Sequence, residues 1–444
     1  MGTMEQKLSY LLDTKNAIKQ AIQDKGINVP EETTFRDYAG KIREIVGTEY
    51  YVPSKPSKGG VDFYDYDGGI LYTYTKEEFM ALNELPPLPE RARLVCQGWN
   101  YTLEDAKANL EELGYVSIGA TYITDDGKTR LYITIDSPFT AEVPLYFSLT
   151  TSNSLVIDWG DGKKEPITGS GALNVTHKYE EIGDYVIAFE VAEGCILGLS
   201  SKQGSSSSYT PLLGTNVVYC NMLKKAEVGS GVTSIGNSTF QYCYSLSSVV
   251  IPQGVTKIDS SAFYYCYSLS SVVIPQGVTS IGQSVFQHCS SLSSVVIPQG
   301  VTKIDTQAFS SCSSLSSVVI PQGVTSIGQN VFSSCSSLSS VVIPQGVTKI
   351  DNSVFYNCYS LSSVVIPQGV TIIGQQVFYY CSSLVVLDCS ELTSVPTLSS
   401  ASTIPTHAEL RIVVPDALYD TWIAATNWSS RASNIIKKSD WDAL

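Results

Sequence analysis

The sequence predicts a multidomain protein whose C-terminal half is a solenoid of stacked coils. The string LSSVVIPQGVT occurs six times without a change, beginning at Leu246 and returning every 23 residues until Leu361. Eight cysteines, from Cys220 to Cys381, follow the same spacing. A short fixed period indicates coils that stack on one another and share one continuous core. A chain of 444 residues is too long for that core alone, so we expect further domains.

Residues 1–46 are expected to form a helical hairpin. Apolar residues recur at helical spacing in two stretches, with Gly26 and Pro30 between them. Because so small a unit buries little alone, its apolar stripes should contact other subunits, another protein or the next domain. Residues 47–60, GTEYYVPSKPSKGG, have the composition of a linker.

A small α/β region is expected over residues 61–130, followed by a β-sandwich over 131–197. The α/β region should contain a strand hairpin and two helices, at Val61–Tyr74, Lys76–Asn83 and Thr102–Leu113. Alternating apolar and polar residues predict four sandwich strands, at Leu131–Ile135, Val143–Leu149, Leu155–Trp159 and Tyr185–Val191. Turns at Asp126-Gly127 and Asp161-Gly162 support the sandwich.

The repeats are expected over residues 223–383, between a junction at 198–222 and a capping region at 384–444. The cap should contain a strand at Leu410–Val414 and a helix at Ala417–Ala425. The first repeat has diverged in its strand, as a terminal coil should. Later coils alternate between TKID and TSIG, so the duplicated unit looks like 46 residues.

One coil can be followed from Leu246 to Ser268. We expect Leu246, Val249 and Ile251 to point inward from a short parallel strand, which Pro252 ends because it cannot donate to a ladder. The chain then returns through two inward apolar residues. A helical turn with Phe263 and Cys266 should close the coil. One coil alone could not offset its ordering entropy, so the coils must stabilise one another.

The cysteines are expected to be free thiols in a buried ladder. No CxxC pair is present, which disfavours structural zinc, and neither a metal nor a cofactor is expected. Stacked coils lie within disulfide range, but parallel Cβ vectors make bonding awkward. Free thiols agree with synthesis in a reducing cytoplasm.

The charge and composition of the chain limit the classes of partner that it is expected to bind. The net charge of -14 argues against nucleic-acid binding. Three lysines and three aspartates are the only charged residues between Leu246 and Ser383, so the solenoid is neutral and suits glycans or polar protein surfaces. No apolar run reaches the ~18 residues of a membrane helix, so no membrane insertion is expected. The start lacks the pattern of a secretion signal.

The repeat pattern LxxVxIPxxVxxIxxxxFxxC resembles BspA-like leucine-rich repeats of bacterial surface proteins. The resemblance implies a curved, mostly β solenoid with parallel strands on its concave face, and an adhesive, non-enzymatic role. The segment with Trp159–Gly162, His177–Tyr179 and Gly183–Tyr185 resembles a PKD domain, which implies a spacer or interaction module. Asp158, Asp161 and His177 would then be structural turn and strand residues.

The whole series of segments is similar to tail-associated proteins of phages and prophages of gut bacteria. It comprises the opening YLLDTKNAIKQ module, the VDFYDYDG region, the PKD-like segment, the BspA-like repeats and the tail VPDALYDTWIAATNW. The resemblance implies a virion protein, made in the host cytoplasm. Residues 1–46 would bind other tail proteins and could hold three copies together as a homotrimer.

The candidate binding surface consists of the few positions that vary between coils. These positions hold Tyr, Ser and Asn, which are the residues that adaptable binding surfaces use. Neutral drift at solvent-exposed positions would produce the same pattern of variation. The candidate residues are Tyr264, Tyr265, Tyr267, Gln287, His288, Tyr356, Asn357, Tyr359, Tyr379 and Tyr380. A candidate apolar contact stripe, exposed unless something covers it, consists of Val250, Val273, Val296, Val319, Val342 and Val365.

The sequence therefore predicts a non-enzymatic recognition protein. GxSxG, P-loop and HExxH motifs are absent from the sequence, and no two of the three histidines lie close together in it, so we expect no enzyme activity. The expected function is a phage or prophage tail receptor-binding protein whose solenoid binds a bacterial surface glycan or protein. The alternative is a bacterial cell-surface adhesin that binds host matrix or other cells.

Overall fold

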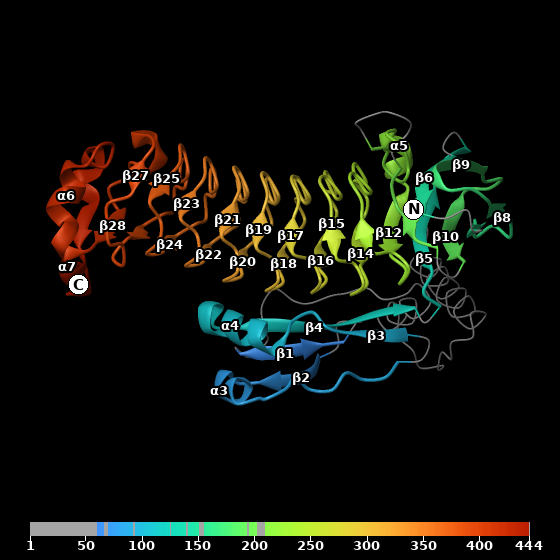
Figure 1. The fold of residues 1–444 in the computed structure, drawn as a ribbon, viewed down its shortest axis with the longest axis horizontal. Coiled ribbons are helices and arrows are strands. Elements are labelled where there is room, and N and C mark those ends of the chain that lie inside the picture. Colours follow the sequence, from blue (N-terminus) through green and yellow to red (C-terminus); the bar gives the residue numbers. More distant parts are fainter. Residues whose placement is uncertain are drawn as a thin grey trace, which may run out of the picture.

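The computed structural model describes residues 60–65, 70–91, 94–124, 126–138, 141–150, 155–192, 195–201 and 209–443. In chain order they form an α/β region, a β-sandwich, a solenoid and a C-terminal cap (Figure 1). The expected helical hairpin at residues 1–46 lies outside the described residues, as does the linker except Gly60. A membrane-spanning helix is not found in the described part of the chain.

The α/β region is a four-stranded sheet with two helices. Its elements are β1 (Val61–Tyr64), β2 (Ile70–Tyr74), α3 (Lys76–Met80), β3 (Leu94–Trp99), α4 (Leu103–Leu113) and β4 (Val116–Thr124). The hairpin of β1 and β2 and both helices confirm the sequence prediction. Strands β3 and β4, which complete the order β2-β1-β4-β3, were missed. Gly98 has a positive φ at a register shift in β3, which breaks the alternation that marks a strand.

The β-sandwich packs two sheets face to face. Its strands are β5 (Thr129–Ile135), β6 (Glu142–Leu149), β7 (Leu155–Asp158), β8 (Lys164–Ile167), β9 (Gly171–Lys178), β10 (Gly183–Val191) and β11 (Leu197–Gly198). One sheet contains β5-β10-β7-β8 and the other is β11-β6-β9. Phe147 and Phe189 meet between them, with ring centroids 5.9 Å apart. The four predicted strands are confirmed, whereas β8 and β9 are largely exposed and carry a weak apolar pattern.

The sandwich and the solenoid share one sheet. Strand β12 (Leu223–Glu227), from the first repeat, pairs antiparallel with β5 and parallel with β14 (Ser248–Val250). This explains why the first repeat has diverged, because its strand packs against the sandwich instead of another coil. Lys225 lies 5.3 Å from the centre of the Tyr132 ring, and the Tyr132 hydroxyl donates to Glu227. The segment before β12 contains the short helix α5 (Val217–Cys220).

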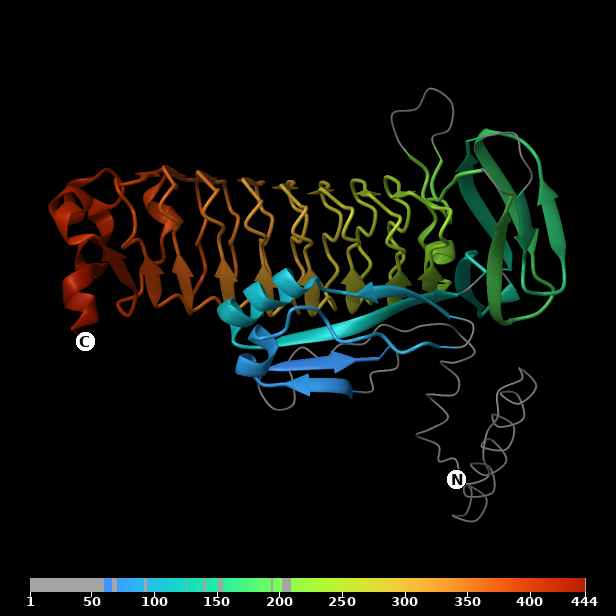
Figure 2. The ribbon, with the colours of Figure 1, turned by 60° about the horizontal axis from the view of Figure 1, so that its bottom comes forward.

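The solenoid consists of two ribbons of short parallel strands. The longer strands after β14 are β16 (Ser271–Val273), β18 (Ser294–Val296), β20 (Ser317–Val319), β22 (Ser340–Val342) and β24 (Ser363–Val365). The shorter ones are β13 (Ser234–Ile235), β15 (Lys257–Ile258), β17 (Ser280–Ile281), β19 (Lys303–Ile304), β21 (Ser326–Ile327), β23 (Lys349–Ile350) and β25 (Ile372–Ile373). Strands pair one repeat apart, as Val272 with Val295, which confirms the 23-residue coil. The coils form a nearly straight row in both views, so the curvature that the resemblance implied is slight (Figures 1 and 2).

The C-terminal cap closes the far end of the row. Its elements are β26 (Val386–Asp388), β27 (Thr397–Leu398), η2 (Ala401–Thr403), β28 (Arg411–Val414), η3 (Asp416–Leu418), α6 (Tyr419–Ala424), η4 (Ser429–Asn434), β29 (Ile435–Lys437) and α7 (Lys438–Asp442). Strand β28 and the run from η3 into α6 confirm the predicted strand and helix. Buried Trp422 and Trp428 cover the last coils, and Trp428 donates to the Pro396 carbonyl at 2.8 Å.

Candidate recognition surface

A stack of phenylalanines and a ladder of cysteines hold the coils in register. The phenylalanine rings from Phe240 to Phe378 lie 5.3–5.8 Å apart, centre to centre. Each thiol from Cys266 to Cys381 donates to a phenylalanine carbonyl of the preceding coil, at 3.0–3.3 Å. All eleven cysteines are free, which confirms the thiol ladder. Burial raises the pKa of the Cys266 and Cys312 thiols well above its ordinary value, so they stay protonated and act as packing groups.

The coil closes through two tight turns, not the helical turn that the sequence suggested. Each of seven coils places two non-glycine residues in the left-handed region, with φ between 55° and 65°. Ser261 and Tyr265 are one such pair, and their N–H groups donate to Gln283 and Gln287 carbonyls of the next coil. These bonds offset the strain of a left-handed side chain. Because β-branched residues fit this region poorly, the narrow choice of residues at the turns has a structural cause.

The candidate residues at these turns gather into two separate groups. We call the first the N-terminal tyrosine cluster, which consists of Tyr242, Tyr244, Tyr264, Tyr265, Tyr267 and His288. The second is the C-terminal tyrosine cluster, which consists of Tyr356, Tyr359, Tyr379 and Tyr380. In the two coils between them serines occupy the turn beside each cysteine, at Ser310, Ser311, Ser333 and Ser334, so the expected single surface is two aromatic areas on one edge. Gln287 and Asn357 lie at the same turns, beside His288 and Tyr356.

Ring contacts order the N-terminal tyrosine cluster across three coils. Tyr242 stacks on Tyr265 with centroids 5.6 Å apart, and Tyr265 stacks on His288 at 4.3 Å and almost parallel. Tyr244 and Tyr267 approach to 5.0 Å beside them. Partial burial, together with a hydrogen bond to Tyr265, raises the pKa of Tyr264 to about 12. Tyr264 therefore stays protonated and uncharged at physiological pH.

The C-terminal tyrosine cluster is more exposed. Tyr356 and Tyr379 stack with centroids 5.9 Å apart, while Tyr380 and Tyr359 are 53% and 47% exposed. In the described residues no group of three or more histidine, cysteine or acidic side chains is placed to hold a metal. This edge of the solenoid therefore exposes aromatic rings together with hydroxyl and amide groups.

The alternation between TKID and TSIG coils has a packing reason. Lys257–Asp259, Lys303–Asp305 and Lys349–Asp351 are ion pairs of 2.7–2.9 Å on every second coil. The coils between them have glycine in the aspartate's position. A Cβ on Gly328 would lie 2.5 Å from the Thr306 nitrogen in the preceding coil, so only glycine lets that backbone approach. Coils therefore pack in pairs of 46 residues.

The valine stripe is not uniformly exposed. Val250 and Val273 are buried, Val296, Val319 and Val342 are half-buried, and Val365 is 53% exposed. Both views place the α/β region beside the ribbon of longer strands (Figures 1 and 2). The Gln97 side chain accepts a hydrogen bond from the Gln253 N–H at 3.5 Å, much as Gln253 accepts from Gln276 in the next coil. The exposure of the stripe therefore increases from Val250 at its N-terminal end to Val365 at its C-terminal end.

The residues of the Trp159–Gly162 turn are structural. Asp161 bonds His177 at 2.8 Å, and the His177 ring stacks on Trp159 at 4.6 Å. The Tyr179 hydroxyl donates to the Trp159 carbonyl. Although burial acts the other way, hydrogen bonds from His177 and Lys163 lower the pKa of Asp161. These contacts tie β9 to the turn after β7, as expected for turn and strand residues.

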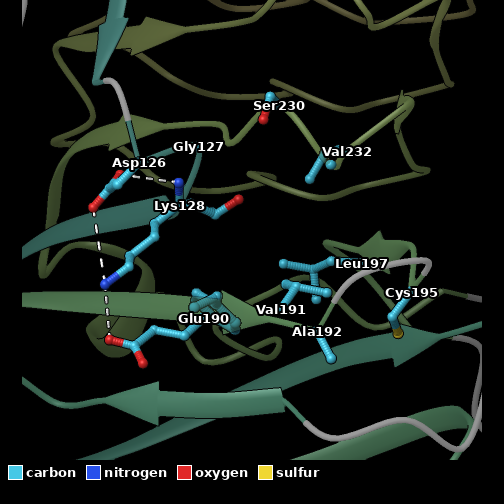
Figure 3. A pocket seen from close by; sticks show the side chains of 13 residues that line it. Asp126, Gly127, Lys128, Glu190, Val191, Ala192, Cys195, Leu197, Ser230 and Val232 are labelled. Atoms are coloured by element: carbon cyan, nitrogen blue, oxygen red, sulfur yellow. Dashed lines mark hydrogen bonds and ion pairs between the residues drawn. The ribbon is translucent and has the colours of Figure 1, made fainter. Parts of the chain in front are cut away.

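A cavity of about 320 Å³ lies between the sandwich and the first coil (Figure 3). Lys128 reaches across it between Asp126 and Glu190, at 3.8 Å and 2.8 Å. Glu190 also pairs with Lys164 at 3.1 Å. The charged side chains at this cavity are thus paired with one another.

The comparisons with known proteins concern the solenoid. The profile of the BspA type leucine rich repeat region matches residues 212–333 and 256–385, less than half of the chain. The solenoid therefore consists of BspA-type leucine-rich repeats, as the sequence resemblance indicated. No curated protein matches the chain.

Three solved structures show what the chain is similar to. A leucine-rich repeat protein from Bacteroides ovatus is 23% identical over 49% of this chain and 63% of its own, with a TM-score of 0.38. The match thus spans under two thirds of that protein. The T. pallidum leucine rich repeat protein is 29% identical over 49% and 91%, with a TM-score of 0.37. A leucine rich cell surface protein from Faecalibacterium prausnitzii is 24% identical over 55% and 88%, with a TM-score of 0.30.

Proposed function

We propose that the chain is a non-enzymatic recognition protein whose solenoid binds a glycan or protein on a bacterial surface. The observation that carries this proposal is the edge with the two tyrosine clusters, displayed on a stack of coils that is covered at both ends. Tyrosine provides a large amphipathic contact area and loses little entropy on binding. The neutral charge of the stretch from Leu246 to Ser383 favours an uncharged partner.

We further propose that the protein belongs to the tail of a phage or prophage, is made in the host cytoplasm and becomes part of the virion. The support is the sequence similarity that runs through nearly the whole chain. In this proposal residues 1–46 bind other tail proteins and could form a homotrimer. The PKD-like sandwich acts as a spacer before the solenoid.

The alternative function is that of a bacterial cell-surface adhesin, which BspA-type repeats favour. A binding experiment separates the two. Fluorescently labelled full chain is incubated with a panel of gut bacterial strains and with immobilised fibronectin, fibrinogen and laminin. Binding to a narrow set of strains is expected for a tail protein. Binding to the matrix proteins without binding to any strain would refute the tail proposal in favour of the adhesin.

A further inference from the structure

A neutral cleft opens at the N-terminal end of the solenoid. Its volume is about 470 Å³. One wall comes from the segment before β12, with Tyr209 and Thr215, and the other from the turns of the first coils, with Asn237, Gln241, Tyr242 and Ser260. None of the described residues that line this cleft is charged. Two tyrosine rings therefore stand among polar side chains that can fix the orientation of a small ligand.

The polar side chains of the cleft are available to a ligand. The hydroxyl and amide groups of Asn237, Gln241 and Ser260 make no hydrogen bond within the part of the chain that the structure describes. The backbone around them is already satisfied, since the Tyr242 N–H donates to the Tyr264 carbonyl of the next coil. The side chains thus provide donors and acceptors on a backbone that is held in place.

The cleft continues into the N-terminal tyrosine cluster. Tyr242 lines the cleft and stacks on Tyr265, which stacks on His288. The rings therefore lead away from the cleft over three coils, a span of roughly 10 Å at the usual spacing of neighbouring strands. Tyr209, 39% exposed, provides a second ring on the opposite wall.

We propose that this cleft and the adjoining rings bind a neutral saccharide, an inference that rests on the proposed recognition function. The faces of tyrosine rings are negative and attract the C–H groups on the flat side of a sugar ring. Hydroxyl and amide side chains match the alternating donors and acceptors of sugar hydroxyls.

The charged side chains that the structure describes around the cleft argue against an ionic ligand. An ionic ligand would lose its hydration in the cleft without gaining an opposite charge. Lys257 interacts with Tyr209 but is neutralised by Asp259 at 2.7 Å, so it offers no free cation for an anionic ligand. The ligand should therefore carry no charge where it contacts the cleft.

The solenoid itself supplies the test variants. Gln241→Ser with Tyr242→Ser gives the first coil the residues that stand at Ser310 and Ser311, so the turn should still form. The matched control, Gln329→Ser with Asn330→Ser, changes a polar turn in a middle coil, away from the cleft. Full-length proteins are applied to an array of neutral and acidic bacterial oligosaccharides and, in parallel, to the panel of gut bacterial strains and the immobilised matrix proteins.

We expect the unaltered chain and the control to bind neutral oligosaccharides and the cleft variant to bind them at least tenfold more weakly, with unchanged melting temperatures. Equal glycan binding by the cleft variant would place the site elsewhere and leave recognition standing. Binding to cells but to no neutral oligosaccharide would overturn the saccharide assignment alone. Binding to neither cells nor matrix proteins would overturn the proposed function with it.

Discussion

The phenylalanine stack should make a central coil sensitive to a single truncation, Phe309→Ala. Phe309 is fully buried between Phe286 and Phe332, at centroid distances of 5.4 Å and 5.7 Å. Removing a buried phenylalanine ring costs about 3–5 kcal/mol. Two stacked contacts vanish together, and each is worth about 0.5–1.5 kcal/mol beyond the buried area, so the loss should lie near the upper end.

Chemical denaturation followed by circular dichroism measures this loss. Gln299→Ala, in an exposed turn of the same coil, is the matched control and should change the free energy of unfolding by less than about 0.5 kcal/mol. Since each coil contacts only its neighbours, hydrogen exchange should increase most in the coils around Phe309. A loss below about 1 kcal/mol, or equal exchange along the whole solenoid, would contradict the stacked core.

Three further predictions concern the thiols, a glycine and pH. In the native protein a thiol reagent should react quickly with Cys96 alone, because Cys96 is exposed while the other ten cysteines are buried; fast reaction of several thiols would contradict the ladder. Gly328→Ala should lower the free energy of unfolding by about 1–3 kcal/mol, because its Cβ would meet backbone at 2.5 Å, whereas Gly254→Ala, whose nearest atom lies at 4.0 Å, should be close to neutral. Burial lowers the pKa of His288 in the folded protein, so on acidification the unfolded chain binds a proton at this histidine at a higher pH than the folded chain does. The free energy of unfolding should therefore fall as the pH drops below 6.5. Denaturation midpoints measured against pH should show a smaller fall for His288→Ser, and an identical fall would mean that His288 is not desolvated.

The repeat architecture could be predicted from the sequence because its signals are local and repeated. Apolar residues at Leu246, Val249 and Ile251 recur in every coil, and all three are buried as expected. The conformation of the turns was harder to predict from the sequence. Tyr265 and His288 have left-handed backbone, and a left-handed position has no sequence signature when it is occupied by neither glycine nor asparagine. An apolar periodicity with Phe263 and Cys266 therefore suggested a helical turn.

The missed features are those that depend on distant parts of the chain. Strand β12 pairs with β5, about 90 residues earlier, and no local pattern shows that the sandwich and solenoid share a sheet. The burial of Val250 likewise depends on its tertiary surroundings. At the candidate site, Tyr264 and Tyr380 could be found from their variation between coils. The cleft could not, because its two walls meet only in the fold.

The central claim is that the tyrosine clusters carry the recognition function. The most direct measurement compares binding isotherms of the full chain on a bound bacterial strain with those of a variant in which both clusters have been replaced. Every residue of the two clusters is changed to the serine that stands at the same position of the middle coils, namely Tyr242, Tyr244, Tyr264, Tyr265, Tyr267, His288, Tyr356, Tyr359, Tyr379 and Tyr380. We predict an affinity at least tenfold lower with a folded solenoid by circular dichroism. Unchanged affinity in the folded variant would contradict the claim.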